Sequence, residues 1–268
     1  MKIEQAKQIT EQALDKLIQA LEAGKSDTLK AYLATMSRFH RYSWGNLLLI
    51  MFQMPKATRV AGFQTWKTLG RFVKKGEKGI MILAPLVVQR GIKAAGEDGP
   101  EPENILLGFR PVYVWDEVQT EGRPLAEISI VTGDPGSYMD RLKTYVAQLG
   151  ISLEYSPDIA PAKGLSQGGK MTLLPDLSPA ESLSVLTHEV SHELMHRSER
   201  RAQTTRTIRE TEAEAVAFVV SHAIGLDGAE ASTSYIQLWN GDKQTLTESL
   251  HFIQVTASQI LTAISPGE

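Results

Sequence analysis

Residues 178–199 carry the feature that most constrains the fold, a helix with a strong start signal. Ser178, Pro179 and Glu181 form a capping box with proline at the first helical position. Apolar side chains recur at helical spacing through the rest of the segment. The helix is therefore predicted to be mostly embedded in protein, where an unpaired His or Glu would be costly.

The same helix contains the pattern H-E-x-x-H within "LTHEVSHELMHRSER". His188 and His192 lie one turn apart and can direct their imidazoles at one point, with Glu189 about 100° round the axis. Two imidazoles in this arrangement hold Zn²⁺, and the Glu deprotonates a water as catalytic base. His196, one turn further, is predicted to support a ligand or to cap the helix end. The alternative is a chance spacing on a surface helix, which the embedded character of the segment disfavours.

A third metal ligand must come from His, Asp or Glu, because the chain has no Cys. The next predicted helix, residues 207–224, begins with acids and becomes apolar. As in thermolysin-like peptidases, Glu210 is predicted as the ligand and Glu214 as the acid that supports a ligand histidine. Two alternatives stay open, namely reversed roles for Glu210 and Glu214, or Glu212 as the ligand. Two solvated carboxylates at a helix start would explain Glu210 but not Glu214.

Peptide hydrolysis also needs a donor to the oxyanion, and Tyr235 is the candidate. The alternative is that Tyr235 anchors a helix in the core. The strand expected over residues 169–175 could flank the cleft and align a peptide along its edge.

The N-terminal half contains a local concentration of basic residues, although the chain as a whole has a formal net charge of −3. Residues 56–78 carry seven Lys and Arg against one acid, interleaved with Phe63, Trp66 and Phe72. Cations along a groove and flat side chains beneath unstacked bases are the components of single-strand binding. Buried aromatics and a solvated basic turn are the alternative interpretation.

The order of elements predicts an α+β protein with two domains, residues 1–132 and 137–268. Three helices precede a small, mostly antiparallel sheet whose strands cover 71–73, 79–89 and 105–119, with 74–79 as a hairpin connection and 91–104 as an exposed loop. The second domain is mainly helical. A helix begins near Tyr138, and strands at 151–155 and 169–175 precede helices at 178–199, 207–224, 230–240 and 243–263.

Composition bounds the setting of the protein. No apolar run approaches the roughly 20 residues that a membrane-spanning helix needs, so we expect a soluble protein without a membrane partner. The absence of Cys fits the reducing cytoplasm.

Two long stretches resemble a known family. Residues 42–85 and 114–122 resemble the N-terminal single-stranded-DNA-binding domain of the ArdC antirestriction family, and "THEVSHELMH", "RETEAEAVAFVVSHAIGL" and "SYIQLWNGDK" are similar to its zincin-like metallopeptidase domain. The resemblance implies a gluzincin-like site with Zn²⁺, His188, His192 and Glu210 as ligands and Glu189 as acid/base. It offers as DNA-contact candidates Arg41, Asn46, Trp66, Lys67, Arg71, Lys74 and Lys75. No basic cluster is recognised around the metal motif, so we expect the second domain not to touch DNA.

Two functional hypotheses follow. The first is a zinc-dependent protease with an unknown protein substrate, tethered to single-stranded DNA and protecting incoming mobile-element DNA. The second is a binding protein that shields single-stranded DNA and keeps an idle or structural metal site.

Overall fold

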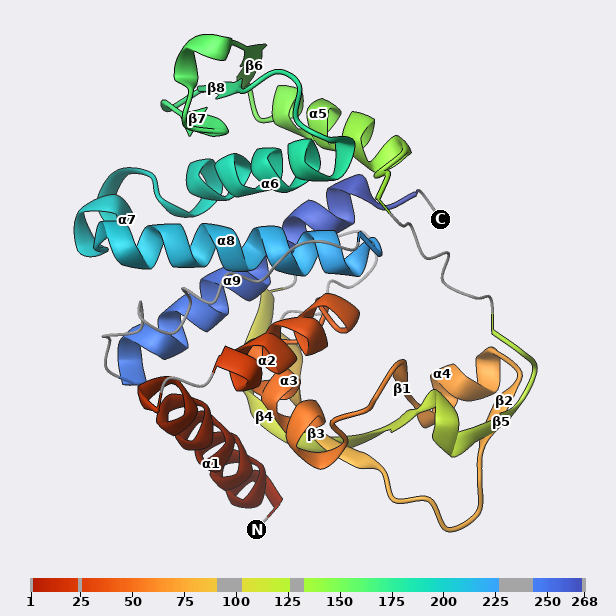
Figure 1. Cartoon of the computed structure of the whole chain (residues 1–268). Coiled ribbons are helices and arrows are strands. Elements are labelled where there is room, and N and C mark those ends of the chain that lie inside the picture. The colour runs from red at the N-terminus through yellow and green to blue at the C-terminus, as the bar shows by residue number, and fades with distance from the viewer. Residues whose placement is uncertain (1, 24–25, 91–102, 126–132, 227–242, 267–268) are drawn as a thin grey trace, which may run out of the picture. The chain divides into compact units, whose positions relative to one another are not determined.

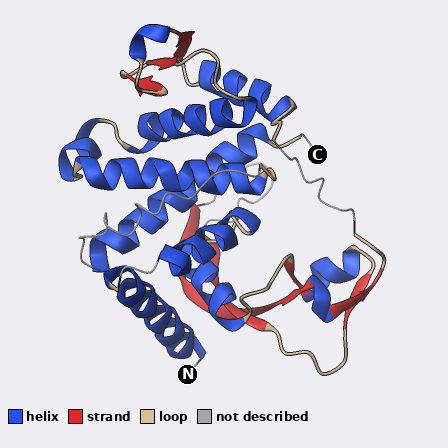
Figure 2. Cartoon of the chain, in the orientation of Figure 1, coloured by secondary structure: helices blue, strands red, loops and turns tan. Residues whose placement is uncertain are grey.

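The computed structural model describes residues 2–23, 26–90, 103–125, 133–226 and 243–266, and combines helices with small sheets (Figure 2). The chain forms two compact units. The first contains Met1–Asp15 and Leu48–Leu125, and the second contains Lys16–Leu47 and Ala126–Glu268. The predicted mixture of helix and sheet is therefore confirmed. None of the helices in these ranges is long and apolar enough to cross a membrane.

Three helices open the chain, as the sequence predicts. They are α1 (Lys2–Glu22), α2 (Ser26–Arg38) and α3 (Trp44–Gln53). Helix α2 packs on a helix of the second unit, and Gln254 Nε2 donates to the His40 carbonyl at 2.7 Å. The segment from Lys16 to Leu47 is thus part of the core of the second unit.

The first unit contains two small antiparallel sheets. One has the order β1-β4-β3, from β1 (Val60–Gly62), β3 (Ile80–Arg90) and β4 (Glu103–Asp116). The other pairs β2 (Arg71–Val73) with β5 (Thr120–Gly122). A short helix α4 (Phe63–Thr68) follows β1, and a 3₁₀ turn η1 (Glu117–Gln119) precedes β5.

The predicted hairpin through residues 74–79 is wrong, because β2 pairs with β5 instead of β3. The buried Arg71 explains this choice of partner. Its Nε donates to Thr120 Oγ1 at 2.8 Å, and a terminal nitrogen donates to the Arg123 carbonyl at 2.6 Å. These hydrogen bonds from the Arg71 guanidinium to oxygens in and next to β5 hold β2 beside β5.

In the second unit a small sheet packs against helix α6 (Pro179–Met195). The sheet has the order β6-β8-β7, with β6 (Ser152–Tyr155) parallel to β8 (Lys170–Leu173) and β7 (Gly164–Ser166) antiparallel to it. Helix α5 (Ser137–Gln148) precedes β6, and a 3₁₀ turn η2 (Pro157–Ile159) precedes β7. The strands predicted near 151–155 and 169–175 are confirmed, whereas the sequence did not indicate β7.

Four further helices complete the described part of this unit: α6 (Pro179–Met195), α7 (Ser198–Gln203), α8 (Arg206–Ala223) and α9 (Lys243–Ile264). Helix α6 lies between the small sheet and α8, and α9 packs on α8 (Figure 1). The core between them is apolar and fully buried, as at Leu186, Val190, Val216 and Ile260.

The helix predicted over 178–199 ends at Met195, with His196 as its C-cap, and a separate helix α7 follows. The helices predicted near 207–224 and 243–263 are confirmed as α8 and α9. The predicted helix 230–240, with Tyr235, lies outside the described residues, as does the predicted loop 91–104 apart from its last two residues.

Candidate metal centre and the cleft around it

Helices α6 and α8 bring three potential metal ligands together. His188 Nε2 and His192 Nε2 lie 3.0 Å apart, and Glu210 Oε2 lies 3.5 Å and 3.6 Å from them. Two ligand atoms held about 2.1 Å from a tetrahedral ion are themselves about 3.4 Å apart. The three separations lie within about 0.4 Å of this value, and the three atoms form a group that could hold a metal ion.

The electrostatics of Glu210 agree with this arrangement. Contacts with His188 and His192 lower the pKa of its carboxyl group, so the carboxylate stays ionised and can act as a ligand. Glu214, one turn further along α8, lines the same cleft and has a polar interaction of its own.

Glu189 lies beside these ligands in a buried position, with 7% of its surface exposed. Burial raises the pKa of its carboxyl group, although the neighbouring His188 and His192 act in the opposite direction. Strand β7 passes very close to it. A Cβ added to Gly164 would lie 2.6 Å from Glu189 Oε1 and 2.7 Å from Val185 Cγ1. Glycine at this position therefore lets the strand approach the carboxylate.

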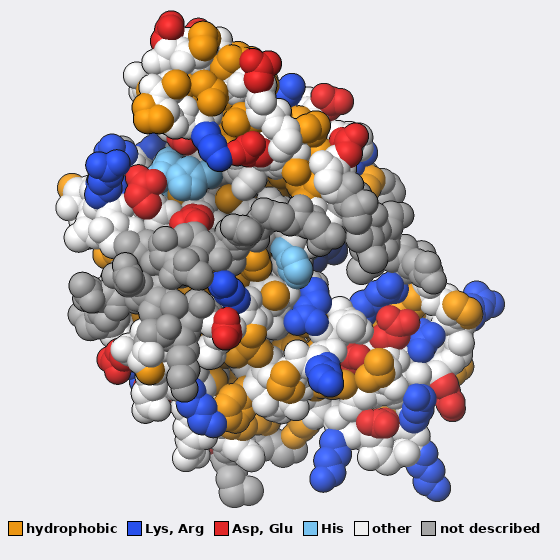
Figure 3. Space-filling model, viewed as in Figure 1, with side chains coloured by type: hydrophobic (Ala, Val, Ile, Leu, Met, Phe, Trp, Pro, Cys, Tyr) orange, Lys and Arg blue, Asp and Glu red, His pale blue; other side chains and the backbone are white. Residues whose placement is uncertain are grey.

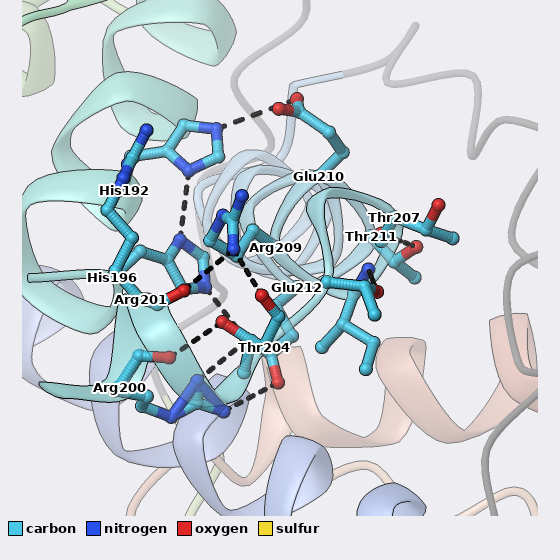
Figure 4. A network of polar contacts seen from close by, with 12 residues as sticks. His192, His196, Arg200, Arg201, Thr204, Thr207, Arg209, Glu210, Thr211 and Glu212 are labelled. Atoms are coloured by element: carbon cyan, nitrogen blue, oxygen red, sulfur yellow. Dashed lines mark hydrogen bonds and ion pairs between the residues drawn. The ribbon is translucent and has the colours of Figure 1, made fainter.

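Behind His192 runs a buried chain of polar contacts, drawn in Figure 4. His192 Nδ1 lies 2.9 Å from His196 Nδ1, and His196 Nε2 lies 2.8 Å from Glu212 Oε2. The side chains of His196 and Glu212 are fully buried. Arg200 from α7 holds both oxygens of Glu212, at 2.7 Å and 3.1 Å, and its guanidinium lies 3.7 Å from the ring centre of Phe252.

This chain of contacts fixes the proton positions on His192. Burial lowers the pKa of His196, so its imidazole is neutral. Its Nε2 donates to the acceptor Glu212, which leaves Nδ1 as an acceptor for the Nδ1–H of His192. His192 Nε2 then presents a lone pair toward Glu210 and His188. Glu212 thus supports the site from behind His192 and is not part of the ligand group formed by His188, His192 and Glu210.

A second buried carboxylate holds the β7–β8 turn against α6. Glu193 accepts hydrogen bonds from Ser166 Oγ, from Gly168 N at 2.9 Å and from Gly169 N at 3.3 Å, and pairs with Arg197. Burial alone would raise its pKa, but these donors outweigh burial and lower it. Sequence alone does not single out Glu193, because its partners come from a turn about 25 residues away along the chain.

We expect Glu193→Ala to destabilise the chain by about 2–4 kcal/mol, because Arg197 and three further donors lose their acceptor. Urea denaturation followed by circular dichroism measures the change.

The matched control is Glu199→Ala, which removes an exposed carboxylate in α7 and should change the free energy of unfolding by less than about 0.5 kcal/mol. Because the pKa of Glu193 is lower in the folded chain than in the unfolded chain, its carboxylate stabilises the fold at pH values above the unfolded pKa of about 4.3. The difference between wild type and Glu193→Ala should therefore shrink as pH falls from that value through the folded pKa. Equal unfolding free energies at neutral pH would contradict this role.

The ligand group and Glu189 lie in one cleft of about 1330 Å³. Strand β7 lines the cleft, and so do four arginines: Arg197, Arg201, Arg206 and Arg209. Figure 3 shows, at the upper left of this face, a pale-blue histidine surface with basic and acidic side chains around it. The expectation that nothing basic surrounds the metal motif is therefore wrong, because the segment after α6 turns back and places its arginines beside the histidines.

Three of the candidate DNA-contact residues are enclosed by the protein. Trp66 is 2% exposed and its Nε1 donates to the Trp115 carbonyl at 2.9 Å. Arg71 and Asn46 are also buried, so these side chains stabilise the fold and do not offer a surface to a base or phosphate. The remaining candidates are exposed: Arg41, Lys67, Lys74 and Lys75.

The structure instead reveals an aromatic row on the first unit. Phe109, Tyr113 and Trp115 are separated by even numbers of residues along β4, so their side chains share one face of the strand. Phe63 contacts Trp115 edge to face, with ring centres 6.2 Å apart. Phe63 and Phe109 are about half exposed and Tyr113 is 41% exposed. Exposure of this kind depends on strand register, which local composition does not reveal.

The fold and the site define a protein of mixed helix and sheet with an H-E-x-x-H centre in its mainly helical unit. Comparison with known proteins adds which of them it is similar to. Residues 7–115 match the model for the N-terminal domain of anti-restriction factor ArdC. This match covers the N-terminal part of the chain, which resembles that domain, and it supports an ArdC-like family.

Proteins of known sequence and structure show the same likeness. An uncharacterized protein of Bacillus anthracis, pXO2-81, is 25% identical over 97% of the chain, and the chain spans about half the length of that relative. The chain has the fold of antirestriction ArdC from plasmid R388. The metal-free ArdC structure gives a TM-score of 0.57 at 19% identity, over 96% of this chain and 97% of ArdC. The Mn(II)-bound ArdC structure gives a TM-score of 0.56 at 19% identity, over 97% of this chain and 99% of ArdC.

Proposed function

We propose that the chain is a metal-dependent peptidase of antirestriction type that also binds single-stranded DNA. The observation that carries the peptidase assignment is the convergence of His188, His192 and Glu210 beside the buried Glu189 in one open cleft. The cleft exceeds the usual size of a small-molecule pocket and suits a polymer segment. The Mn(II)-bound ArdC structure supports a divalent ion in this fold.

Zn²⁺ is the ion that we propose, because two imidazoles and one carboxylate with an open position are a common catalytic zinc set. Bound there, it would polarise the substrate carbonyl and lower the pKa of a water. Burial raises the pKa of Glu189, which makes its carboxylate a stronger base for the proton of the attacking water. The water oxygen adds to the carbonyl carbon, the C–N bond breaks, and Glu189 returns the proton to the leaving amine nitrogen.

Strand β7 is the element that we propose to align the peptide. Among the described strands it pairs with β8 alone, and its residues line the cleft. A peptide in extended conformation could pair with its second edge and pass over Glu189, which Gly164 approaches closely.

Chelation and reloading test the peptidase assignment. The full chain, stripped of metal and then supplied with Zn²⁺, should cleave an unfolded protein substrate such as casein only in the reloaded state. Cleavage that persists in excess chelator would reject the metal-dependent mechanism. Metal binding without any cleavage over a broad set of substrates would favour the binding-only alternative.

The DNA-binding assignment is supported by the ArdC N-terminal match and by the aromatic row of Phe63, Phe109, Tyr113 and Trp115. Lys67 lies one turn after Phe63 on α4, on the same face. An exposed row of rings with a neighbouring cation suits successive unstacked bases and a phosphate. Protection of incoming mobile-element DNA would follow from such binding.

We expect Phe109→Ala to weaken binding of a fluorescein-labelled oligothymidylate by roughly tenfold, because one stacking surface is lost. Fluorescence anisotropy measures the affinity. Val118→Ala removes an apolar side chain that is 59% exposed in the same unit but outside the row, and should leave the affinity within about twofold. Equal effects of the two substitutions would show that the row is not the binding surface.

A further inference from the structure

We infer that Arg201 and Arg206 form the acidic-residue pocket of the cleft and select peptides that carry Asp or Glu close to the bond that is cleaved. The inference rests on the proposed peptidase function and deepens it by naming the substrate class.

Five arginines lie between residues 197 and 209, and three of them are occupied within the fold. Arg197 pairs with Glu193, and Arg200 pairs with Glu212. Arg209 donates to the Thr204 carbonyl and, at 3.0 Å, to the Arg201 carbonyl. These contacts hold α7 against α8 and thereby place the backbone of Arg201 beside the start of α8 (Figure 4).

Arg201 and Arg206 differ from these three. Both line the cleft and both are exposed. Within the described residues, neither guanidinium forms an ion pair or hydrogen bond. The cleft therefore contains two arginine side chains with all donors available to a ligand.

Their position relative to the metal ligands sets where a bound acid would lie. Arg206 precedes Glu210 by one helical turn on the same face of α8, a rise of about 6 Å along the axis. An extended peptide advances about 3.3 Å per residue. An acidic side chain within about three residues of the reacting bond can therefore reach Arg206, and Arg201 lines the same cleft.

The position of Arg206 does not stabilise its helix, which favours a role in binding a ligand. Arg206 lies in the first turn of α8, where the helix dipole disfavours positive charge. Guanidinium groups bind carboxylates through two parallel hydrogen bonds and stay charged at all relevant pH values. A localised carboxylate is thus the ligand that fits this end of the cleft.

A peptide fits the whole cleft better than a nucleic acid does. Glu189, Glu210 and Glu214 line the same space and would repel a continuous row of phosphates. Strand β7 lines it as well and offers backbone groups to an extended peptide. A bound peptide suits both parts of the cleft if it places one acidic residue at Arg201 and Arg206 and neutral residues beside the three glutamates.

Binding to the full-length Glu189→Gln protein loaded with Zn²⁺ tests the pocket without cleavage. The probes are a labelled peptide with two Glu residues, the same peptide with Gln in their place, and a labelled oligothymidylate. We expect the Glu peptide to bind about tenfold more tightly than the Gln peptide, and Arg201→Ala/Arg206→Ala to remove that difference.

Lys143→Ala/Lys170→Ala is the matched control, since it removes two exposed positive charges from the same unit outside the cleft. It should change peptide affinity by less than about twofold. Arg201→Lys/Arg206→Lys keeps the charge but loses the paired donors, and should restore only part of the preference. Equal binding of Glu and Gln peptides would overturn the inference. So would a double Ala substitution that weakens oligothymidylate binding and leaves the peptides unaffected.

Cleavage by the wild-type chain separates this inference from the proposed function. Hydrolysis of Glu and Gln peptides at equal rates would preserve the peptidase and reject the acidic pocket. Selective Glu-peptide binding, with no hydrolysis of any peptide, would preserve the pocket and reject the peptidase.

Discussion

Replacing Glu189 by Gln is expected to lower peptide hydrolysis by about 10²–10⁴-fold while zinc binding and oligonucleotide binding persist. The amide keeps the shape of the side chain but cannot accept the proton of the attacking water. Burial of Glu189 leaves little room for another base to replace it. Initial rates on a fluorogenic peptide, with zinc content measured on the same samples, give both quantities.

Glu199→Gln is the matched control for this substitution, because Glu199 is an exposed carboxylate on the neighbouring helix α7. It should retain the wild-type rate. Hydrolysis by Glu189→Gln at the wild-type rate would remove Glu189 from the mechanism. Loss of zinc from the same variant would instead assign Glu189 a role in binding the ion.

Replacing His196 by Phe is expected to weaken zinc binding by about 10–100-fold. The ring volume is kept, but His192 loses the acceptor that directs its Nε2 lone pair toward the site, and Glu212 loses a donor. Competition with a chromophoric chelator measures the affinity, and thermal denaturation measures whether the fold persists.

His196→Gln distinguishes positioning from packing. Its amide oxygen can accept from His192 and its amide nitrogen can donate to Glu212, so it should recover part of the affinity lost in His196→Phe. Similar zinc affinities for wild type and His196→Phe would show that His196 does not position the ligand. An equal loss in both variants would show that packing, and not the hydrogen bonds, matters.

The sequence predicted the elements of the site better than their connections. Capping at Ser178 and the four-residue spacing of His188 and His192 depend on local helix geometry, which sequence reveals. Glu210 could be chosen by the same geometry. The role of Glu212 could not, because it depends on the break at His196 and on α7 returning Arg200 to the carboxylate.

Burial and strand pairing limited the prediction in the N-terminal half. Trp66 and Phe109 are both aromatic residues beside basic ones, but Trp66 is 2% exposed and Phe109 is 49% exposed. Their difference follows from the pairing of β4 with β1 and β3, which is long-range. The pairing of β2 with β5 is likewise set by the buried Arg71 and not by the turn that follows β2.

An anomalous difference map from a crystal of the zinc-loaded chain tests the central claim most directly. We predict one strong peak within about 2.1 Å of His188 Nε2, His192 Nε2 and a carboxylate oxygen of Glu210, with Glu212 still bound to His196. A peak coordinated by other side chains, or no peak at this position in the zinc-loaded crystal, would contradict the account.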